Sequence, residues 1–259
     1  MTNKEEGKML KEFRAKHGYE VEDFWLPRVT SILQIVAKPG LLRYYAQQKN
    51  FTAAQEAMRL AAENGIKVHD AAENFLQGKD GFDPKLKPIM QELVKWRAKH
   101  DIEVIAVEKK IIDNQEHFYC GTADILARID GEVGIVDIKT GSGIWEEYGL
   151  QTAAYAHAHN KAAAKDQKAT ASWILRLDKY EVCDICGAKR RDKEGHIKIT
   201  GGKYFCQHDF NAPMGEIEFK KMKGMDESYR AFLSAKDLWE WANRKFLGQI
   251  KNYPKNLHN

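Results

Sequence analysis

The stretch Phe118–Lys139, FYCGTADILARIDGEVGIVDIK, decides the fold of this chain. It holds two runs rich in aliphatic residues, and Asp130-Gly131 stands between them as a hairpin turn signal. The preceding segment, Ile102–Asp113, alternates as a strand does and ends at the turn Asn114-Gln115. Together these segments predict a three-stranded antiparallel meander.

Helical patterns surround the meander. Leu41–Gln77 is rich in alanine and repeats apolar residues at helical spacing, with Gly65 expected to interrupt it, and another helix follows Pro84. After the meander the pattern predicts a helix, a parallel strand, a further strand and a last helix, at residues 148–165, 169–177, 216–220 and 227–247. The order predicts an α/β fold with a central mixed sheet.

Length and composition fit one large domain with a small appendage. The chain has 259 residues, 43% of them hydrophobic, which is too many for a disordered chain. Its net charge of +4 favours an anionic partner only weakly. No segment reaches the roughly 18 apolar residues of a membrane span, and no secretory signal is evident. We expect a cytoplasmic protein without membrane contact, with residues 1–28 as a polar, loosely ordered extension of a domain over 29–259.

Two aspartates and a lysine lie where predicted strands end. Asp124 closes Gly121-Thr122-Ala123-Asp124, and a hairpin of this length could place it beside Asp137. Lys139 shares a strand face with Asp137. Carboxylate oxygens suit Mg²⁺ or Mn²⁺, which would polarise a phosphate and activate a water that Lys139 could orient. The tripeptide Asp-x-Lys also occurs by chance at solvated hairpin rims, so it identifies no site alone.

The order of these residues resembles the PD-(D/E)XK nuclease superfamily, and within it the RecB-like exonuclease branch. The His, G-x-x-D, D-x-K and Q-x-x-x-Y motifs of that branch have counterparts, in order and approximate spacing, at His69, Gly121–Asp124, Asp137–Lys139 and Gln151–Tyr155. The resemblance covers roughly residues 29–177. It implies a restriction-endonuclease-like αβββαβ core with a helical N-terminal region, and a metal-dependent DNA nuclease.

The resemblance also implies a metal site. Asp124 and Asp137 would bind Mg²⁺ or Mn²⁺, and His69 would be a further ligand from the preceding helical region. The Ile138 carbonyl would face the metal. Lys139 would be the catalytic lysine. A single histidine is more often a surface or core residue, so the assignment of His69 depends on the other motifs.

Three further residues complete the expected site. Gln151 and Tyr155 lie four apart, so they share a helix face, which in the family lies beside the active site and helps to bind DNA. Simple helix packing is the alternative for this pair. Glu108 would support catalysis without binding the metal, and a solvated strand-end charge is its alternative.

The implied activity is hydrolysis of DNA phosphodiesters to 5′-phosphate products. We expect an exonuclease acting on DNA ends or single strands in recombination, repair or phage DNA metabolism, encoded by a bacterial host or a phage. A structure-specific endonuclease and a non-catalytic DNA-binding module of the same fold are the alternatives. The chain has no helicase motifs, so unwinding would need a partner such as a helicase or a recombination or replication protein.

A cysteine-rich insertion interrupts the pattern at residues 180–211. Cys183-Asp184-Ile185-Cys186-Gly187 has the form of a zinc knuckle, and Cys206 and His208 follow. Three thiolates and an imidazole would make a tetrahedral structural Zn²⁺ site, and so apolar-poor a segment needs such a cross-link to fold. The insertion carries cations that could contact phosphates: Lys189, Arg190, Arg191, Lys193, Lys198 and Lys203.

Other interpretations of the insertion remain open. His196 or Asp209 could replace His208 as the fourth ligand, and free thiols or a protein-interaction module would need no DNA contact. Some RecB-like nucleases carry an iron–sulfur cluster on four cysteines, one before the core and three after it. Here Cys120 lies inside the predicted core and no cysteine precedes His69, so we favour zinc and expect Cys120 to be a small buried residue.

Overall fold

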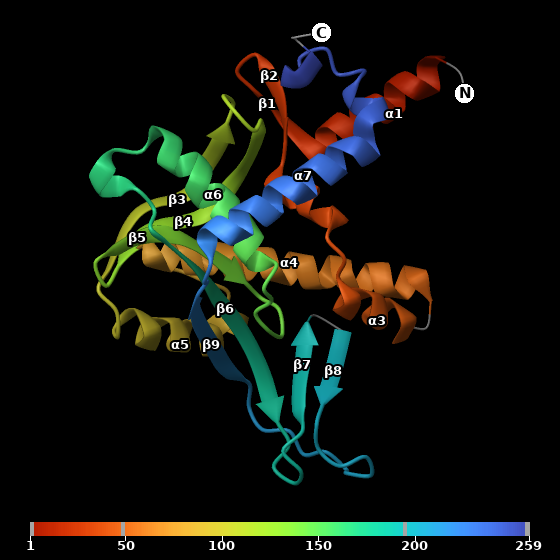
Figure 1. The fold of residues 1–259 in the computed structure, drawn as a ribbon. Coiled ribbons are helices and arrows are strands. Elements are labelled where there is room, and N and C mark those ends of the chain that lie inside the picture. The colour runs from red at the N-terminus through yellow and green to blue at the C-terminus, as the bar shows by residue number, and fades with distance from the viewer. Residues whose placement is uncertain (1–2, 48–49, 194–195, 257–259) are drawn as a thin grey trace.

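A seven-stranded mixed sheet forms the centre of the computed structural model, which describes residues 3–47, 50–193 and 196–256 (Figure 1). Its strands β3 to β9 are Ile102–Asp113, Tyr119–Ile129, Glu132–Lys139, Ala171–Val182, Lys189–Lys193, His196–Thr200 and Met214–Lys221. The strand order is β3-β4-β5-β6-β7-β8, and β9 pairs with β6. Neighbours are antiparallel except β5 and β6, which are parallel. The expected α/β class and mixed sheet are therefore confirmed.

Helices cover both faces of the sheet. The α-helices α1 to α7 are Asn3–His17, Val29–Ile32, Pro39–Gln47, Phe51–Leu76, Lys87–Arg97, Tyr148–Ala162 and Met225–Leu247. Short 3₁₀ turns lie at Leu33–Ile35, Pro84–Leu86, Lys165–Gln167 and Pro254–Asn256. α6 and α7 lie on one face, and α4 and α5 on the other (Figure 1). Among the described residues, no helix combines the length and apolar character that crossing a bilayer requires.

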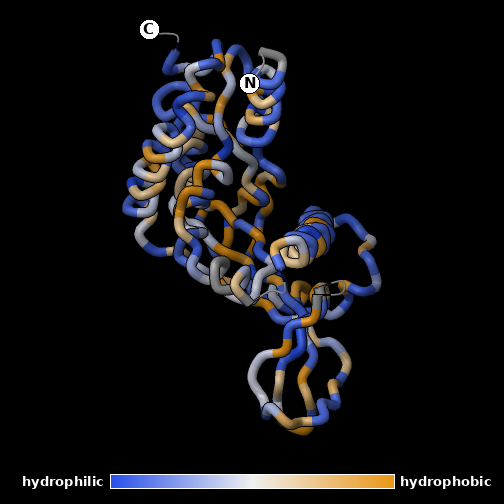
Figure 2. The backbone as a smooth tube through the Cα atoms, turned by 90° about the vertical axis from the view of Figure 1, so that its right-hand side faces the viewer, coloured by the Kyte–Doolittle hydropathy of each residue, from blue (hydrophilic) through white to orange (hydrophobic). Residues whose placement is uncertain are grey.

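Two apolar clusters result from this layering. One includes Leu126 and Ile135 of the sheet with residues of α6 and α7, and the other includes Ile125 and Ile138 with residues of α4 and α5. Hydrophobic segments accordingly gather in the interior of the main body (Figure 2). The meander matches its prediction, and Asp130 and Gly131, with φ of 50° and 88°, form the hairpin turn between β4 and β5.

The break expected at Gly65 is wrong, because α4 runs unbroken from Phe51 to Leu76. A Cβ at Gly65 would lie 3.1 Å from the Thr140 hydroxyl oxygen, just beyond the end of β5. Glycine therefore serves close packing here, at a modest cost in helix propensity. This approach brings the following turns of α4 toward the end of β5.

The expectation of a loosely ordered N-terminal segment is also wrong. α1 and the hairpin of β1 (Gly18–Val21) with β2 (Phe24–Pro27) pack onto the sheet domain. Trp25 is 1% exposed, and its backbone N–H donates to the Asn252 carbonyl at 3.0 Å. Phe13 stacks on Phe246 of α7 with ring centroids 4.6 Å apart. The segment is polar on average, but Phe13 and Trp25 belong to the main core.

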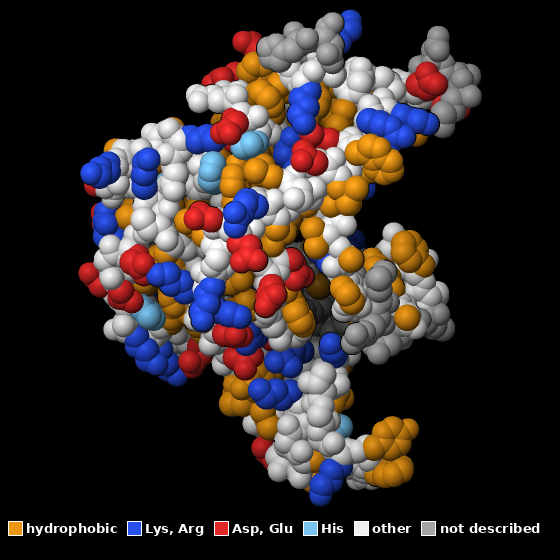
Figure 3. All heavy atoms as spheres, viewed as in Figure 1, with side chains coloured by type: hydrophobic (Ala, Val, Ile, Leu, Met, Phe, Trp, Pro, Cys, Tyr) orange, Lys and Arg blue, Asp and Glu red, His pale blue; other side chains and the backbone are white. Residues whose placement is uncertain are grey.

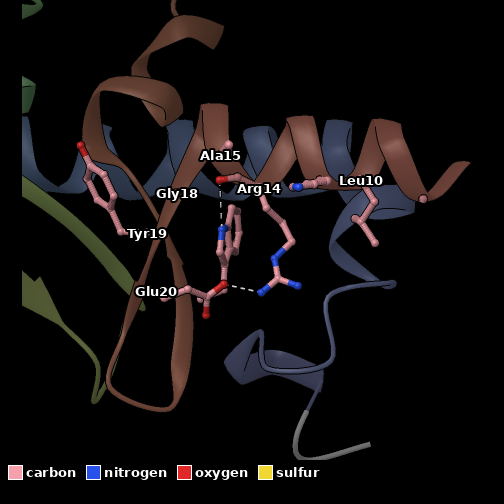
Figure 4. A pocket seen from close by; sticks show the side chains of 9 residues that line it. Leu10, Arg14, Ala15, Gly18, Tyr19 and Glu20 are labelled. Atoms are coloured by element: carbon pink, nitrogen blue, oxygen red, sulfur yellow. Dashed lines mark hydrogen bonds and ion pairs between the residues drawn. The ribbon is translucent and has the colours of Figure 1, made fainter. Parts of the chain in front are cut away.

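A cavity of about 480 Å³ lies where α1 meets the β1–β2 hairpin (Figure 4). The Arg14 guanidinium at its wall is paired with Glu20, and the Trp25 indole N–H donates to the Arg14 carbonyl at 3.3 Å. The residues predicted from the motifs line other parts of the molecule. The cavity is therefore a feature of N-terminal packing and lies away from the candidate site.

A finger, residues 180–211, projects from the sheet. β6 continues to Val182, past its expected end at Leu177, and β7 and β8 form an antiparallel hairpin beside this extension. The finger leaves the main body at one end of the sheet (Figures 1 and 2).

Replacing Trp25 with alanine tests whether the N-terminal segment belongs to the core. We expect the free energy of unfolding to fall by about 3–5 kcal/mol, the usual cost of removing a buried indole. Urea unfolding followed by circular dichroism measures it. Trp241→Ala is the matched control, since that indole is 64% exposed. Equal stability of Trp25→Ala and the control would show that the segment is a dispensable appendage.

Candidate functional site

The β4–β5 ladder ends at the two aspartates that the motifs predict. Its last pair is Ile125 opposite Val136, so Asp124 and Asp137 are the next residues on the two strands. The Ile138 N–H donates to Asp124 Oδ2 at 2.7 Å. A side-chain carboxylate thus satisfies a strand N–H where the ladder stops, which holds Asp124 against the end of β5.

The side-chain alternation of β4 is interrupted at this point. Ala123 and Leu126 both belong to the α6–α7 cluster although they lie three residues apart, and Ile125 belongs to the α4–α5 cluster. Regular alternation would place residues three apart on opposite faces. The interruption accompanies the placement of the Asp124 carboxylate beside α4.

α4 supplies an imidazole and a carboxylate to the same place. His69 Nδ1 lies 3.5 Å from Asp124 Oδ2, and a hydrogen bond links His69 to the Ile138 backbone. His69, Glu73 and Asp124 each offer a ligand atom, and these atoms lie within 4.8 Å of one another. Glu73 was not predicted, although its spacing of four from His69 places both on one helix face and was visible in the sequence.

Asp137 lies outside this group of three and is held by other partners. The Gln151 amide donates to Asp137 Oδ1 at 2.8 Å, and the Lys139 ammonium lies 2.6 Å from Asp137 Oδ2. The Asp137 side chain is 1% exposed, so its half of this ion pair is buried. Lys139 also donates to Gln151 Oε1 at 3.3 Å. The D-x-K and Q-x-x-x-Y residues therefore form one connected network.

Tyr155 contacts both this network and the backbone of β4. Its hydroxyl lies 3.4 Å from the Gln151 amide nitrogen, and a Cβ at Gly121 would lie 2.7 Å from its ring. The glycine of G-x-x-D is thus required because the tyrosine packs against the β4 backbone. With 2% of its surface exposed, Tyr155 offers DNA no surface of its own. Tyr155 could therefore affect DNA binding, as expected from the motif, only indirectly, by positioning Gln151.

Glu108 lies farther out than the other predicted residues. Its neighbours Val107 and Lys109 pair with Ile125 and Ala123, so Glu108 occupies the β3 position across from Asp124. It is exposed and has a φ of 46°, an uncommon conformation for a residue with a side chain. Together with Glu73 it lines an acidic cavity of about 270 Å³. The negative charge of Glu108 affects the site by raising the pKa of Glu73.

The electrostatics favour a bound cation. Burial and the Asp137 charge raise the pKa of Asp124 well above its usual range. Burial lowers the pKa of His69, and burial with the nearby Glu108 and Asp70 raises the pKa of Glu73 to about 7. These carboxylates repel one another in a partly desolvated place. An oxygen-rich set with one imidazole therefore fits Mg²⁺ or Mn²⁺.

Lys139 is held in its charged form. Burial alone would lower its pKa, but the charges of Asp137 and Asp124 and a hydrogen bond to Asp137 together outweigh burial and raise the pKa of Lys139. The ammonium also lies 5.1 Å from the centre of the Tyr148 ring. Lys139 can therefore act as a fixed positive charge or a proton donor, and it is poorly suited to accept a proton.

The finger brings its cysteines together. Cys183, Cys186, Cys206 and His208 place their ligand atoms within 4.8 Å of one another, a cluster that could bind a metal such as zinc. Cys183 Sγ lies 3.8 Å from Cys206 Sγ, and Cys186 Sγ lies 3.4 Å from His208 Nδ1. Of the alternative ligands, Asp209 is not in the cluster, and the His196 side chain lies outside the described residues. Cys120 is buried away from it, as expected.

The protonation of the cluster suits metal binding. Burial alone would raise the pKa of Cys183, but hydrogen bonds from His208 and the backbone lower it to about 6. The His208 pKa rises through the same contact with Cys183. Burial and the neighbouring sulfurs raise the pKa of Cys206 to about 12. Without a metal Cys206 therefore keeps its proton, which it would release when a metal binds. Zn²⁺ is the ion that such an S₃N set prefers.

Comparison with known proteins assigns no family to this geometry, because the chain matches no protein-family model and no curated protein. The functional argument therefore depends on the side chains and on their arrangement.

Replacing Glu73 with glutamine tests the acidic character of the first site. A Glu73 pKa raised from 4.5 to about 7 means that the folded protein keeps a proton that the unfolded chain loses. The contribution of this group to the free energy of unfolding is therefore present below about pH 4.5 and lost as pH rises toward 7. Without added divalent cation, Glu73→Gln should flatten that decline in urea unfolding. Glu63→Gln, an exposed change on α4, is the control, and identical pH profiles for all three proteins would contradict the shift.

Cys183→Ser tests the second site. We expect the variant to lose about one equivalent of zinc by mass spectrometry, because structural zinc rarely survives the loss of a thiolate. The circular dichroism of the main body should persist, since its apolar clusters do not involve the finger's cysteines. Cys120→Ala should keep its zinc. A zinc-free wild type with reactive thiols, or a brown protein containing iron and sulfide, would reject the assignment.

Proposed function

We propose that this chain is a metal-dependent DNA nuclease with a restriction-endonuclease-like core. The observation that carries the proposal is the meeting of Asp124, Asp137 and His69 at the end of the β4–β5 ladder, with Lys139 beside them. Two carboxylates, an imidazole and a lysine are the groups that hydrolysis of a phosphodiester at a divalent cation requires.

The order of elements supports the proposed core. A helix precedes the meander β3–β5, α6 follows it, and β6 then pairs in parallel with β5. This is the αβββαβ order that the resemblance implies. The four motifs also come from separate elements, α4, β4, β5 and α6, and meet at one place.

Asp124, Asp137 and His69 are the proposed ligands, with Glu73 added from the structure and the Ile138 carbonyl close by. Their oxygen atoms suit Mg²⁺ or Mn²⁺, and a bound ion would supply charge neutralisation of the phosphate and a lowered pKa for water. Glu108 and Asp70 lie farther out. They would add negative potential, which attracts the cation.

The remaining residues hold and move charge around the phosphate. The Lys139 ammonium would stabilise the negative charge that develops on the scissile phosphate, or orient the attacking water. Gln151 bonds to both Asp137 and Lys139, so it would fix the distance between the carboxylate and the ammonium. Tyr155 would hold Gln151 in place.

For the substrate we propose DNA ends or single strands, and for the reaction exonucleolytic hydrolysis. A structure-specific endonuclease is the second form, and circular single-stranded DNA separates the two because it offers no end. Unwinding of a duplex would fall to a partner such as a helicase or a recombination or replication protein. We place this activity in the cytoplasm of a bacterial cell, as a host or phage function.

Alanine substitutions at Asp124, Asp137 and Lys139 test the proposal. Each should lower cleavage of labelled linear DNA by about 10²-fold or more, the usual loss when one preorganised charged group is removed. The assay uses single-stranded and duplex substrates with Mg²⁺, Mn²⁺ or EDTA. Gln151→Ala should give a smaller loss, because it only positions the charged groups.

Asp166→Ala, an exposed change on the loop before β6, is the matched control and should cleave as wild type does. Activity retained in both aspartate variants would reject the site. A wild type that binds DNA but cleaves none with either metal would favour a non-catalytic DNA-binding module of the same fold.

A further inference from the structure

Two aromatic side chains form the outermost turn of the finger. Tyr204 and Phe205 are each 93% exposed, and their rings meet edge to face with centroids 4.9 Å apart. The Cys206 N–H donates to the Lys203 carbonyl at 3.1 Å, which makes these aromatics the two central residues of a turn. Such positions are normally taken by glycine, proline, asparagine, aspartate or serine. Two fully exposed rings there have no role in folding the finger.

The turn is anchored by the cysteine cluster. Cys206 ends the turn and lies 3.8 Å from Cys183. Binding of zinc would therefore fix the base of the turn and hold both rings outward. Aromatic rings presented on a rigid loop lose little conformational entropy when they bind.

The position of the finger relates the turn to the candidate active site. β5 and β6 are parallel, Lys139 at the end of β5 pairs with Arg176, and β6 continues beyond Arg176 to Val182. Both strands therefore point to the same edge of the sheet. At about 3.3 Å per residue, the extension places the base of the finger roughly 20 Å beyond the site. Figure 3 shows hydrophobic side chains at the far end of this projection.

The charges around the turn are few. Arg190 pairs with Glu181 and Arg191 pairs with Asp178, so the arginines expected to contact phosphates are engaged within the protein. Lys198 and Lys203 are exposed. Asp184 and Asp209 are exposed on the finger as well, so its exposed charge is mixed and the two aromatic faces are what suit stacking on bases.

We propose that Tyr204 and Phe205 bind single-stranded DNA by stacking on its bases, at a subsite beyond the candidate active site on the same sheet edge. A duplex hides its bases in its own stack, whereas every base of a single strand offers an aromatic face. A protein partner would also contact the exposed Ile185, Ile197 and Ile199 of the finger, whereas base stacking needs only the two rings. The inference rests on the proposed function for its ligand and extends it by naming the strand that the finger contacts.

Binding of a fluorescein-labelled oligo-dT of about 20 nucleotides tests the proposal, with the zinc-loaded full chain and no added Mg²⁺ or Mn²⁺. The double variant Tyr204→Ala/Phe205→Ala should bind at least about fivefold more weakly, the lower limit for loss of one stacked base. The ratio between variant and wild type should stay constant as salt rises, because stacking releases no counterions. Tyr204→Trp/Phe205→Trp should bind as wild type does, since it keeps both rings.

Trp241→Ala removes a ring on α7 that is 64% exposed and should leave binding unchanged. Zinc content should be equal in all variants. Wild-type affinity in the double alanine variant would overturn the proposal, as would equal loss of duplex and single-strand binding. Self-association that the double variant abolishes would assign the turn to a second copy of the chain instead. These outcomes do not depend on cleavage, so a chain that binds through the turn but hydrolyses nothing would reject the nuclease while the subsite stands.

Discussion

The hydrogen bond from the Ile138 N–H to Asp124 Oδ2 is the contact on which the candidate site depends. It replaces a backbone pair at the end of a ladder and ties the two strands that carry the aspartates. Ile138 is fully buried in the α4–α5 cluster, so its backbone has little freedom to move. The backbone of Ile138 also forms a hydrogen bond with His69 of α4. One strand residue thus sets the positions of groups from three elements.

This arrangement concentrates negative charge where water is scarce. Asp124 is held beside Asp137 and Glu73, and its raised pKa reflects both burial and repulsion. Lys139 neutralises part of that charge but is itself bound to Asp137 and Gln151. A protein whose only need was stability would gain by replacing such groups with apolar residues. Charged groups that are held in contact and have shifted pKa values are typical of functional sites.

The sequence predicted those parts of the fold that depend on local features, such as alternation, turn residues and cysteine spacing. Alternation and Asp130-Gly131 predicted the meander almost to its observed ends, and the cysteine spacing predicted the cluster of three cysteines and a histidine that could bind a metal. The N-terminal segment was missed because its mean polarity hides Phe13 and Trp25, which are buried by a partner helix far along the chain. Gly65 was misjudged because a close approach to Thr140 is a tertiary fact. Propensity describes single elements and carries no information on such contacts.

The candidate site shows the same division. Motif order brought His69, Asp124, Asp137, Lys139 and Gln151 together, because each belongs to a motif that lies on one predicted element. Glu73 was overlooked because no motif includes it, although helical spacing from His69 was sufficient to find it. The burial of Tyr155 could not be predicted, since it depends on how closely α6 approaches Gly121. The sequence motifs therefore located the candidate site residues, and tertiary packing determined which of their side chains can reach a ligand.

The two clusters differ in chemistry, since one offers mainly oxygen and the other mainly sulfur. Anomalous diffraction at the manganese edge from a crystal of the zinc-loaded protein soaked in Mn²⁺ tests the central claim most directly. The account predicts a manganese peak in direct contact with the carboxylates of Asp124 and Asp137 and the imidazole of His69, and none at the cysteines. A map with no manganese between the two aspartates, at a concentration that supports binding elsewhere, would contradict it.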